Sequence, residues 1–174
     1  MKFLTIIPAR EGSKGIKNKN FINFLGKPLI EHTLIFAKKL KNNNIIISSD
    51  SEKTKKLSNK YKIISSYKRP KKLSKDKVLL KDTLEHVFKW SISNQIDFDY
   101  ILLLQPTSPL RKMSDFDKIK KILKKNKIDT LCSVTKVKHH PAEYVKKNFK
   151  SWSFMLKAKR GLRQQYKDNY YFID

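Results

Sequence analysis

Cysteine is nearly absent from the sequence, which contains a single one, Cys132. One cysteine cannot form an internal disulfide, and Cys132 lacks the cysteine and histidine companions of a zinc site. This usage is typical of proteins that stay in a reducing cytoplasm. We expect Cys132 to lie within a strand, as a small residue of the hydrophobic core.

Long apolar runs, internal repeats and low-complexity linkers are missing as well. No run reaches the roughly 18 residues of a membrane-spanning helix, so we expect no membrane insertion. The N-terminal apolar run is short and is interrupted by Pro8 and by charged residues, which favours a buried strand over a signal peptide. A length of 174 residues with 39% hydrophobic residues is enough for one folded core.

Acidic residues are scarce. The chain has 15 Asp and Glu against 40 Lys and Arg, which gives a formal net charge of +25. Such a charge is typical of proteins that bind nucleic acids. The lysines, however, are spread along the whole chain, which favours solvated helix faces over a dedicated nucleic-acid surface. The arginines are more informative because they bind phosphate and carboxylate well; they are Arg10, Arg69, Arg111, Arg160 and Arg163.

What the sequence does contain is an alternation of apolar runs with helical stretches. This alternation predicts an α/β fold with a mostly parallel sheet covered by helices. The predicted strands are residues 3–8, 44–48, 62–66, 100–104 and 130–134, and the predicted helices are residues 28–40, 51–60, 78–93 and 114–125. The most apolar strand, 100–104, should be central. Residues 152–155 alternate weakly, like an edge or hairpin strand, and the chain stops at residues 170–174 in what looks like the middle of another strand.

The helix predicted at 78–93 has an apolar stripe at helical spacing, and we expect that stripe to face the core. Its members are Leu80, Leu84, Val87, Phe88 and Ile92.

The segment between the first strand and the first helix could bind an anion. It lies at the carboxyl end of a strand, where open α/β sheets place ligands, and Gly12 and Gly15 let backbone amides approach phosphate oxygens. Arg10 and Lys19 would add charge that stabilises a pentavalent phosphate. The spacing fits neither the Walker loop nor the GxGxxG dinucleotide signature, so the residues alone leave an ordinary basic turn open as an alternative.

The sequence motifs along the whole chain resemble those of the cytidylyltransferases that make CMP-N-acylneuraminate, and of their legionaminate and pseudaminate relatives. The first loop reads PARxGSKGIxxKN and is followed by GKPL, and residues 105–111 read QPTSPLR. The motifs SD at 49–50, HHP at 139–141 and RQ at 163–164 follow in the same order. The resemblance implies a three-layer, Rossmann-like nucleotidyltransferase fold with a small dimerisation arm. It also implies transfer of CMP from CTP to a nonulosonic, sialic-type acid for cell-surface glycan biosynthesis.

The resemblance assigns roles by position. Arg163 and Lys19 would serve catalysis. The expected CTP-binding residues are Arg10, Ser13, Lys14, Asn20, Arg69 and Val78, and the expected sugar-binding residues are Gln105, Thr107, Ser108 and Gln164. Each has a simpler alternative. Arg10 and Arg69 could be surface cations, and Gln105 could merely satisfy backbone groups at a strand end. The pair His139 and His140 is interpreted as structural.

The family resemblance further implies a Mg²⁺ cofactor and a homodimer. The nucleotide-binding core would comprise residues 1–138, and residues 139–174 would form the dimerisation arm and the start of a return to the core. The Asp-x-Asp pair that binds Mg²⁺ in the family is missing from this sequence, so the metal ligands are unknown and the chain looks truncated. Asp50 and Asp76 could approach a metal, but their spacing does not pair them. A non-catalytic protein that binds nucleic acid or another polyanion is the alternative.

Overall fold

The computed structural model describes residues 1–12, 16, 18–41, 43–126, 128–137, 141, 144–147, 151–154 and 171–173. The chain divides into two compact units, Met1–Lys118 and Ile119–Asp174. The boundary that the sequence predicts, after residue 138, stays a prediction.

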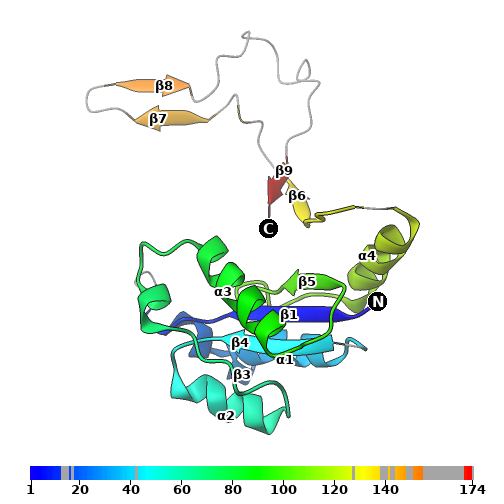
Figure 1. Cartoon of the computed structure of the whole chain (residues 1–174). Helices are drawn as coiled ribbons and strands as arrows, with labels where there is room; N and C mark the ends of the chain where they lie inside the picture. The colour runs from blue at the N-terminus through cyan, green and yellow to red at the C-terminus, as the bar shows by residue number, and fades with distance from the viewer. Residues whose placement is uncertain are drawn as a thin grey trace. The chain divides into compact units, whose positions relative to one another are not determined.

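A three-stranded parallel sheet forms the centre of the first unit (Figure 1). Its strands are β1 (Phe3–Pro8), β4 (Asn43–Ser48) and β5 (Tyr100–Leu103), in the order β4-β1-β5. The register pairs Ile6 with both Ile46 and Leu103. The expected parallel sheet is therefore confirmed. The expectation that the strand at 100–104 is central was wrong, because β1 pairs on both sides and β5 lies at an edge of the described sheet.

Helices lie close to the predicted positions. They are α1 (Leu29–Lys38), α2 (Glu52–Lys60), α3 (Leu80–Ser93) and α4 (Met113–Lys125). Two short 3₁₀ helices, η1 (Lys19–Phe21) and η2 (Lys71–Ser74), and an antiparallel pair, β2 (Asn23–Phe24) with β3 (Lys27–Pro28), complete the described first unit. Within the described part of the chain, no helix combines the length and the apolar character that crossing a membrane requires.

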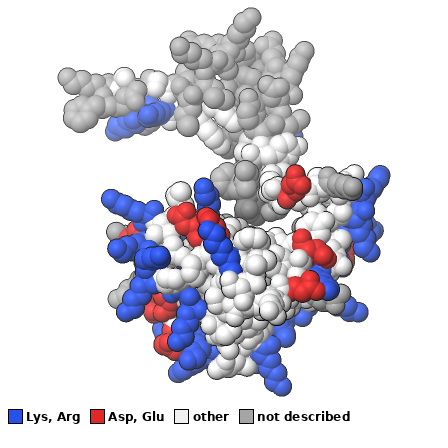
Figure 2. Space-filling model, in the orientation of Figure 1, with Lys and Arg blue, Asp and Glu red and all other residues white. Residues whose placement is uncertain are grey.

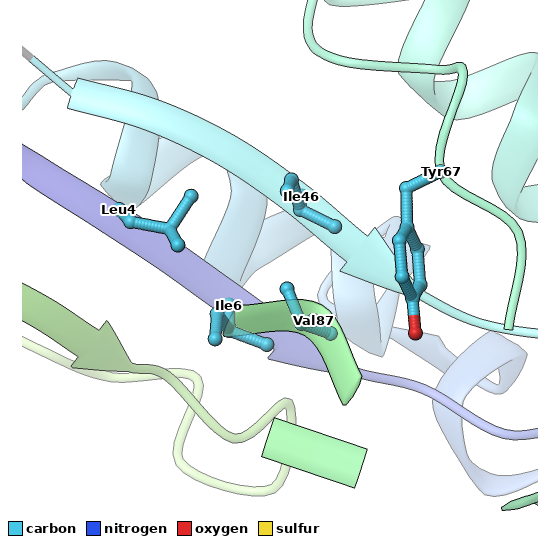
Figure 3. Packing of buried hydrophobic residues seen from close by; sticks show 5 residues of the cluster. All are labelled: Leu4, Ile6, Ile46, Tyr67 and Val87. Atoms are coloured by element: carbon cyan, nitrogen blue, oxygen red, sulfur yellow. The ribbon is translucent and has the colours of Figure 1, made fainter. Parts of the chain in front are cut away.

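The sheet is covered on both faces. Side chains alternate along a strand, so Leu4 and Ile6 of β1 share one face and Phe3 lies on the other. Figure 3 shows Leu4 and Ile6 packed with Ile46 of β4, Val87 of α3 and Tyr67 in the same cluster of buried residues. On the opposite face the Phe116 ring of α4 lies 5.3 Å from that of Phe3 and 6.5 Å from that of Phe36 in α1. The three layers are α3, the sheet, and α1 with α4.

The inward face of α3 differs from the predicted one. Val87 is buried and Leu84 packs against the core, as expected. Three other members of the predicted stripe are partly exposed: Leu80, Phe88 and Ile92 are 38%, 41% and 56% exposed. The fully buried residues are instead Thr83, Val87 and Ser91, spaced at i, i+4 and i+8. Small residues on this stripe let the helix approach the sheet closely. Hydrophobicity alone does not reveal that the stripe with these small residues faces the sheet.

Two other predicted strands differ as well. The segment at 62–66 makes only one isolated bridge, between Ile46 and Ile64. Lys62 has a φ of +49°, and the amides of Lys62 and Ile63 bond back to the carbonyls of Asn59 and Ser58 at the end of α2, so they cannot enter a ladder. The strand expected at 130–134 starts later, as β6 (Val134–Lys136). Cys132 precedes it and is exposed, so its assignment to the core was wrong.

The second unit contains two antiparallel strand pairs. Strand β6 pairs with β9 (Tyr171–Ile173), and β7 (Val145–Lys147) pairs with β8 (Trp152–Phe154). The hairpin-type strand expected near residue 152 and the strand expected at the end of the chain are both confirmed.

Candidate nucleotide site

The first loop, residues 9–20, leaves the carboxyl edge of the sheet. The Ala9 amide donates to the Ser48 carbonyl at 2.9 Å, which extends the pairing of β1 with β4 by one residue. The Glu11 amide donates to Asp50 Oδ1 at 2.9 Å. Gly12 follows with a φ of +79°, a conformation that residues with a Cβ rarely adopt. The first loop is therefore held by the segment that follows β4.

Asn20 ends the first loop and is buried. Its side-chain amide donates to the Arg10 carbonyl at 3.2 Å and so joins the two ends of the loop. Of the expected loop residues, Arg10, Lys19 and Asn20 are described, whereas Ser13 and Lys14 lie outside the described residues.

Arg10 is held from the segment before α3. Its Nη1 donates to Asp76 Oδ1 at 2.7 Å and to the Ser74 carbonyl at 3.4 Å. Both partners of this ion pair are about one-third exposed, so it is screened by solvent. One arm of the guanidinium is thus tethered by residues 74–76.

Arg69 is buried, with 8% of its surface exposed. Its amide donates to the Ser49 carbonyl, and Nε and Nη2 both donate to the Leu73 carbonyl. Burial lowers the pKa of the Arg69 guanidinium, while the charge of Asp50 opposes that shift. Arginine nevertheless stays protonated in proteins, so Arg69 is a buried cation with a defined position and not a surface cation.

The glutamine turn, residues 105–111, follows β5. Ser108 N donates to the Gln105 carbonyl at 3.3 Å, which closes a turn. Arg111 then donates to the carbonyls of Gln105 and Ser108, at 2.8 and 2.6 Å, and to Thr33 Oγ1 of α1 at 3.3 Å. Arg111 therefore closes the turn and attaches it to α1.

A cavity of about 480 Å³ lies between these segments, wholly within the first unit. Its polar wall is formed by Arg10, Lys19, Asn20, Arg69, Thr83, Gln105 and Thr107. Six of these residues, all but Thr83, were predicted from the sequence to bind substrate or to act in catalysis, and three separate segments of the chain supply the six. Ser108 is not part of the wall. Arg163 and Gln164, like His139 and His140, lie outside the described residues.

The remaining wall of the cavity is apolar. It consists of Pro8, Ile16, Val78, Leu80 and Pro106. Val78 was expected there, but sequence reasoning missed Leu80 and Thr83, because it placed Leu80 against the core and did not consider Thr83. Both residues lie in the first turns of α3, shortly after the predicted Val78. That position is the feature of the sequence that could have identified them as cavity residues. A cavity with cations and apolar surface suits a ligand that carries both phosphates and a ring.

Metal ligands were tested for in the same region. The described residues contain no group of three or more His, Cys, Asp or Glu that could hold an ion. Asp50 already accepts the Glu11 amide, and Asp76 already pairs with Arg10. The described residues therefore do not by themselves form a Mg²⁺ site.

Comparisons with known proteins identify the family and the fold. The profile of a family described as cytidylyltransferase matches residues 4–164. An N-acylneuraminate cytidylyltransferase of Streptococcus agalactiae is 32% identical over 173 residues, which cover 95% of this chain and 40% of that protein. A CMP-N,N'-diacetyllegionaminic acid synthase of Legionella pneumophila is 36% identical over 116 residues, which cover 64% of this chain and 49% of that protein.

A solved structure shares the fold. It is a CMP:2-keto-3-deoxy-manno-octonic acid synthetase complexed with CTP, with a TM-score of 0.56 and 20% identity over 77% of this chain and 51% of that chain. The chain spans about 40% of the length of the Streptococcus agalactiae relative. Because the family profile covers most of the sequence and the expected α/β fold is present, the chain belongs to the cytidylyltransferase family.

Proposed function

We propose that the protein transfers CMP from CTP to a nonulosonic, sialic-type acid and releases pyrophosphate. The anomeric hydroxyl oxygen of the sugar acid would attack the α-phosphorus of CTP. A new oxygen–phosphorus bond forms, the bond to the β-phosphate bridge breaks, and the hydroxyl proton is released. The observation that carries this proposal is the cavity, in which Arg10, Lys19 and Arg69 meet Gln105 and Thr107 from another strand end.

The charges of the cavity suit this reaction. Two anionic substrates must be held together while negative charge builds up on the leaving pyrophosphate, so the protein must supply positioned cations. We assign Arg10, Ser13, Lys14 and Lys19 to the triphosphate end, with Asn20, Arg69 and Val78 at the nucleoside. Gln105, Thr107, Ser108 and Gln164 would hold the sugar acid, and Arg163 would join Lys19 in catalysis.

Several wider features are part of the proposal. We assign Mg²⁺ as the cofactor, which usually binds nucleotides through their phosphates and few protein ligands. We also propose a homodimer in which the arm at 139–174 contacts the neighbouring subunit, and a cytoplasmic location where CTP is available. The family resemblance and the single cysteine support these points.

CTP binding tests the first half of the proposal. CTP should raise the melting temperature of the protein, and calorimetry should give a dissociation constant that Arg10→Met weakens by at least about tenfold, since a charged hydrogen bond is worth 1.5–3 kcal/mol. Lys2→Met, which removes a cation at the opposite, amino-terminal edge of the sheet, is the matched control. Lack of CTP binding at millimolar concentration would refute the proposal.

Pyrophosphate release tests the second half. The assay combines the protein, CTP and Mg²⁺ with sialic, legionaminic or pseudaminic acid in separate reactions, and the eight-carbon acid Kdo serves as the comparison. We expect turnover with at least one of the nine-carbon acids. The sequence SKGI in the first loop favours sialic or legionaminic acid as the substrate.

A polyanion-binding protein is the second candidate, and the net charge of +25 motivates it. On the face shown in Figure 2, however, Lys and Arg side chains are spread over several places and are interrupted by Asp and Glu. Duplex DNA or RNA affinity that falls steeply with salt, without stabilisation by CTP, would support this candidate.

A further inference from the structure

One residue in the wall of the cavity, Thr83, carries a hydroxyl group that has no partner among the described residues. Thr83 is 0% exposed, and its Oγ1 has no hydrogen-bond partner among the described residues. Buried hydroxyl groups nearly always find a partner, because leaving one unpaired costs free energy. The cavity beside Thr83 is where a partner could arrive.

Ser91 provides a comparison within the same helix. It is also 0% exposed with an unpartnered Oγ, and it lies on the same stripe of α3 two turns further on. Ser91 is not part of the cavity wall, whereas Thr83 is. Two residues with similar buried hydroxyl groups thus differ in whether they border the cavity.

The surroundings of Thr83 indicate which part of a ligand it meets. Val78 and Leu80, from the same stretch of chain, line the cavity with apolar surface. A phosphate beside such surface would lose its hydration without gaining a charge partner. A neutral ring with polar atoms at its edge fits better, and a threonine hydroxyl can donate to a carbonyl or accept from an amino group.

We propose that Thr83 is a specificity-determining residue whose hydroxyl bonds a neutral polar atom of the nucleoside part of the ligand. This inference rests on the proposed function and names the part of CTP that the start of α3 recognises. The stripe Thr83, Val87 and Ser91 then has two tasks, since it packs α3 on the sheet and presents one hydroxyl to the nucleotide.

Thr83→Val tests the proposal, since valine keeps the shape and removes the hydroxyl. We expect the affinity for CTP to fall about 3- to 10-fold, as for one hydrogen bond. CMP should lose affinity by the same factor, because the phosphates are not involved. The melting temperature of the ligand-free protein should not fall, because an unpaired buried hydroxyl is removed. Thr83→Ser, which keeps the hydroxyl, should retain most of the affinity.

Ser91→Ala is the matched control, and it should leave the affinity for both nucleotides unchanged. If the wild-type protein binds CTP and Thr83→Val binds it equally well, the inference is wrong while the proposed function stands. If Thr83→Val folds poorly, Thr83→Ala replaces it. CTP affinity should then be about 3- to 10-fold lower for Thr83→Ala than for Thr83→Ser, which keeps the hydroxyl. Failure of the wild-type protein to bind CTP or CMP overturns the proposed function, and the inference with it.

Discussion

The two loops that follow β1 and β5 line the same cavity but keep their shapes in different ways. The first loop depends on side chains from distant parts of the chain: Asp50 holds the Glu11 amide, and Asp76 holds Arg10. The glutamine turn depends mainly on Arg111, which lies within the turn and bonds two of its carbonyls. Besides the internal bond from Asn20, the first loop is held from outside, whereas the glutamine turn is closed by its own Arg111 and has one further bond to α1.

This difference has a consequence for ligand binding. The carbonyl acceptors of the glutamine turn do not titrate and are not competitors of a bound anion. In the first loop, by contrast, Asp76 occupies the guanidinium that we assign to the triphosphate. The glutamine turn should therefore be formed before substrate arrives, whereas the arriving phosphates must compete for Arg10.

Replacing Arg111 should have the largest effect. Arg111→Met removes the charged donor of the Ser108 carbonyl and leaves the Gln105 carbonyl with only the Ser108 amide, and we expect a loss of about 2–3 kcal/mol in unfolding free energy. Thermal unfolding measures this loss. Lys112→Met, at the exposed neighbouring position, should change stability little. Equal melting temperatures for Arg111→Met and the wild-type protein would show that the turn does not depend on this residue.

Two glycines that have a positive φ within the described part of the chain allow a matched test of the first loop. Gly12 and Gly26 have φ values of +79° and +81°, and an added Cβ would meet nothing within 4 Å at either. Each change to alanine should therefore cost only the conformational strain of about 1–2 kcal/mol. Both variants should unfold at a similarly lowered temperature, but only Gly12→Ala should also weaken CTP binding. Equal CTP binding by the two variants would contradict a role for the first loop.

Removing the charge of Asp76 tests the competition for Arg10. Asp76→Asn should bind CTP about 1.4- to 5-fold more tightly at low salt, which corresponds to the 0.2–1 kcal/mol typical of exposed ion pairs. The gain should shrink as salt is added, and it should be smaller for CMP. Asp97→Asn is the control, because Asp97 pairs with Lys2 at the amino-terminal edge of the sheet. Weaker CTP binding by Asp76→Asn would mean that Asp76 orients Arg10 for the ligand.

The difference between the two loops also decides what the sequence could predict. Strand β1 was predicted with its final bounds, because a short apolar run after the N-terminus leaves few other structures. The convergence of Arg10, Lys19, Arg69 and Gln105 followed from family motifs placed at the ends of parallel strands. The partners of the first loop could not be predicted, because Glu11 and Asp50 are 39 positions apart and Arg10 and Asp76 are 66 positions apart.

The stripe on α3 shows a second limit of prediction. Hydrophobicity favours Leu80, Phe88 and Ile92 for the core, yet the buried stripe carries Thr83 and Ser91. Which stripe faces the sheet depends on how closely the helix packs, and that is a property of the folded unit. With this stripe of α3 toward the sheet, Leu80 and Thr83 border the cavity. The wrong prediction of the inward face of α3 and the failure to predict these two cavity residues therefore have one cause.

Acid should affect the first loop before the glutamine turn. Glu31 of α1 is buried and accepts bonds from Lys60 Nζ at 2.7 Å and Tyr61 OH at 2.5 Å, which brace the helix that follows Asp50. Burial alone would raise the pKa of Glu31, but these bonds and the charges of Lys60 and Lys27 outweigh it, so the pKa is lowered. Burial, together with the hydrogen bond to Glu31 and its charge, raises the pKa of Tyr61 to about 12, which keeps it a donor.

The sign of the pH effect follows from this lowered pKa. The ionised Glu31 contributes stability that is fully present above the ordinary glutamate pKa of about 4.3 and is lost as pH falls through the lower pKa of the folded protein. The wild-type protein should therefore lose more stability on acidification than Glu31→Gln, which cannot titrate there. Hydrogen exchange, expressed as protection relative to the intrinsic rate at each pH, should show a loss of protection of the amides at Glu11 and in α2 at low pH, with little change at Ser108. Parallel pH profiles for the two proteins would show that Glu31 does not brace the first loop.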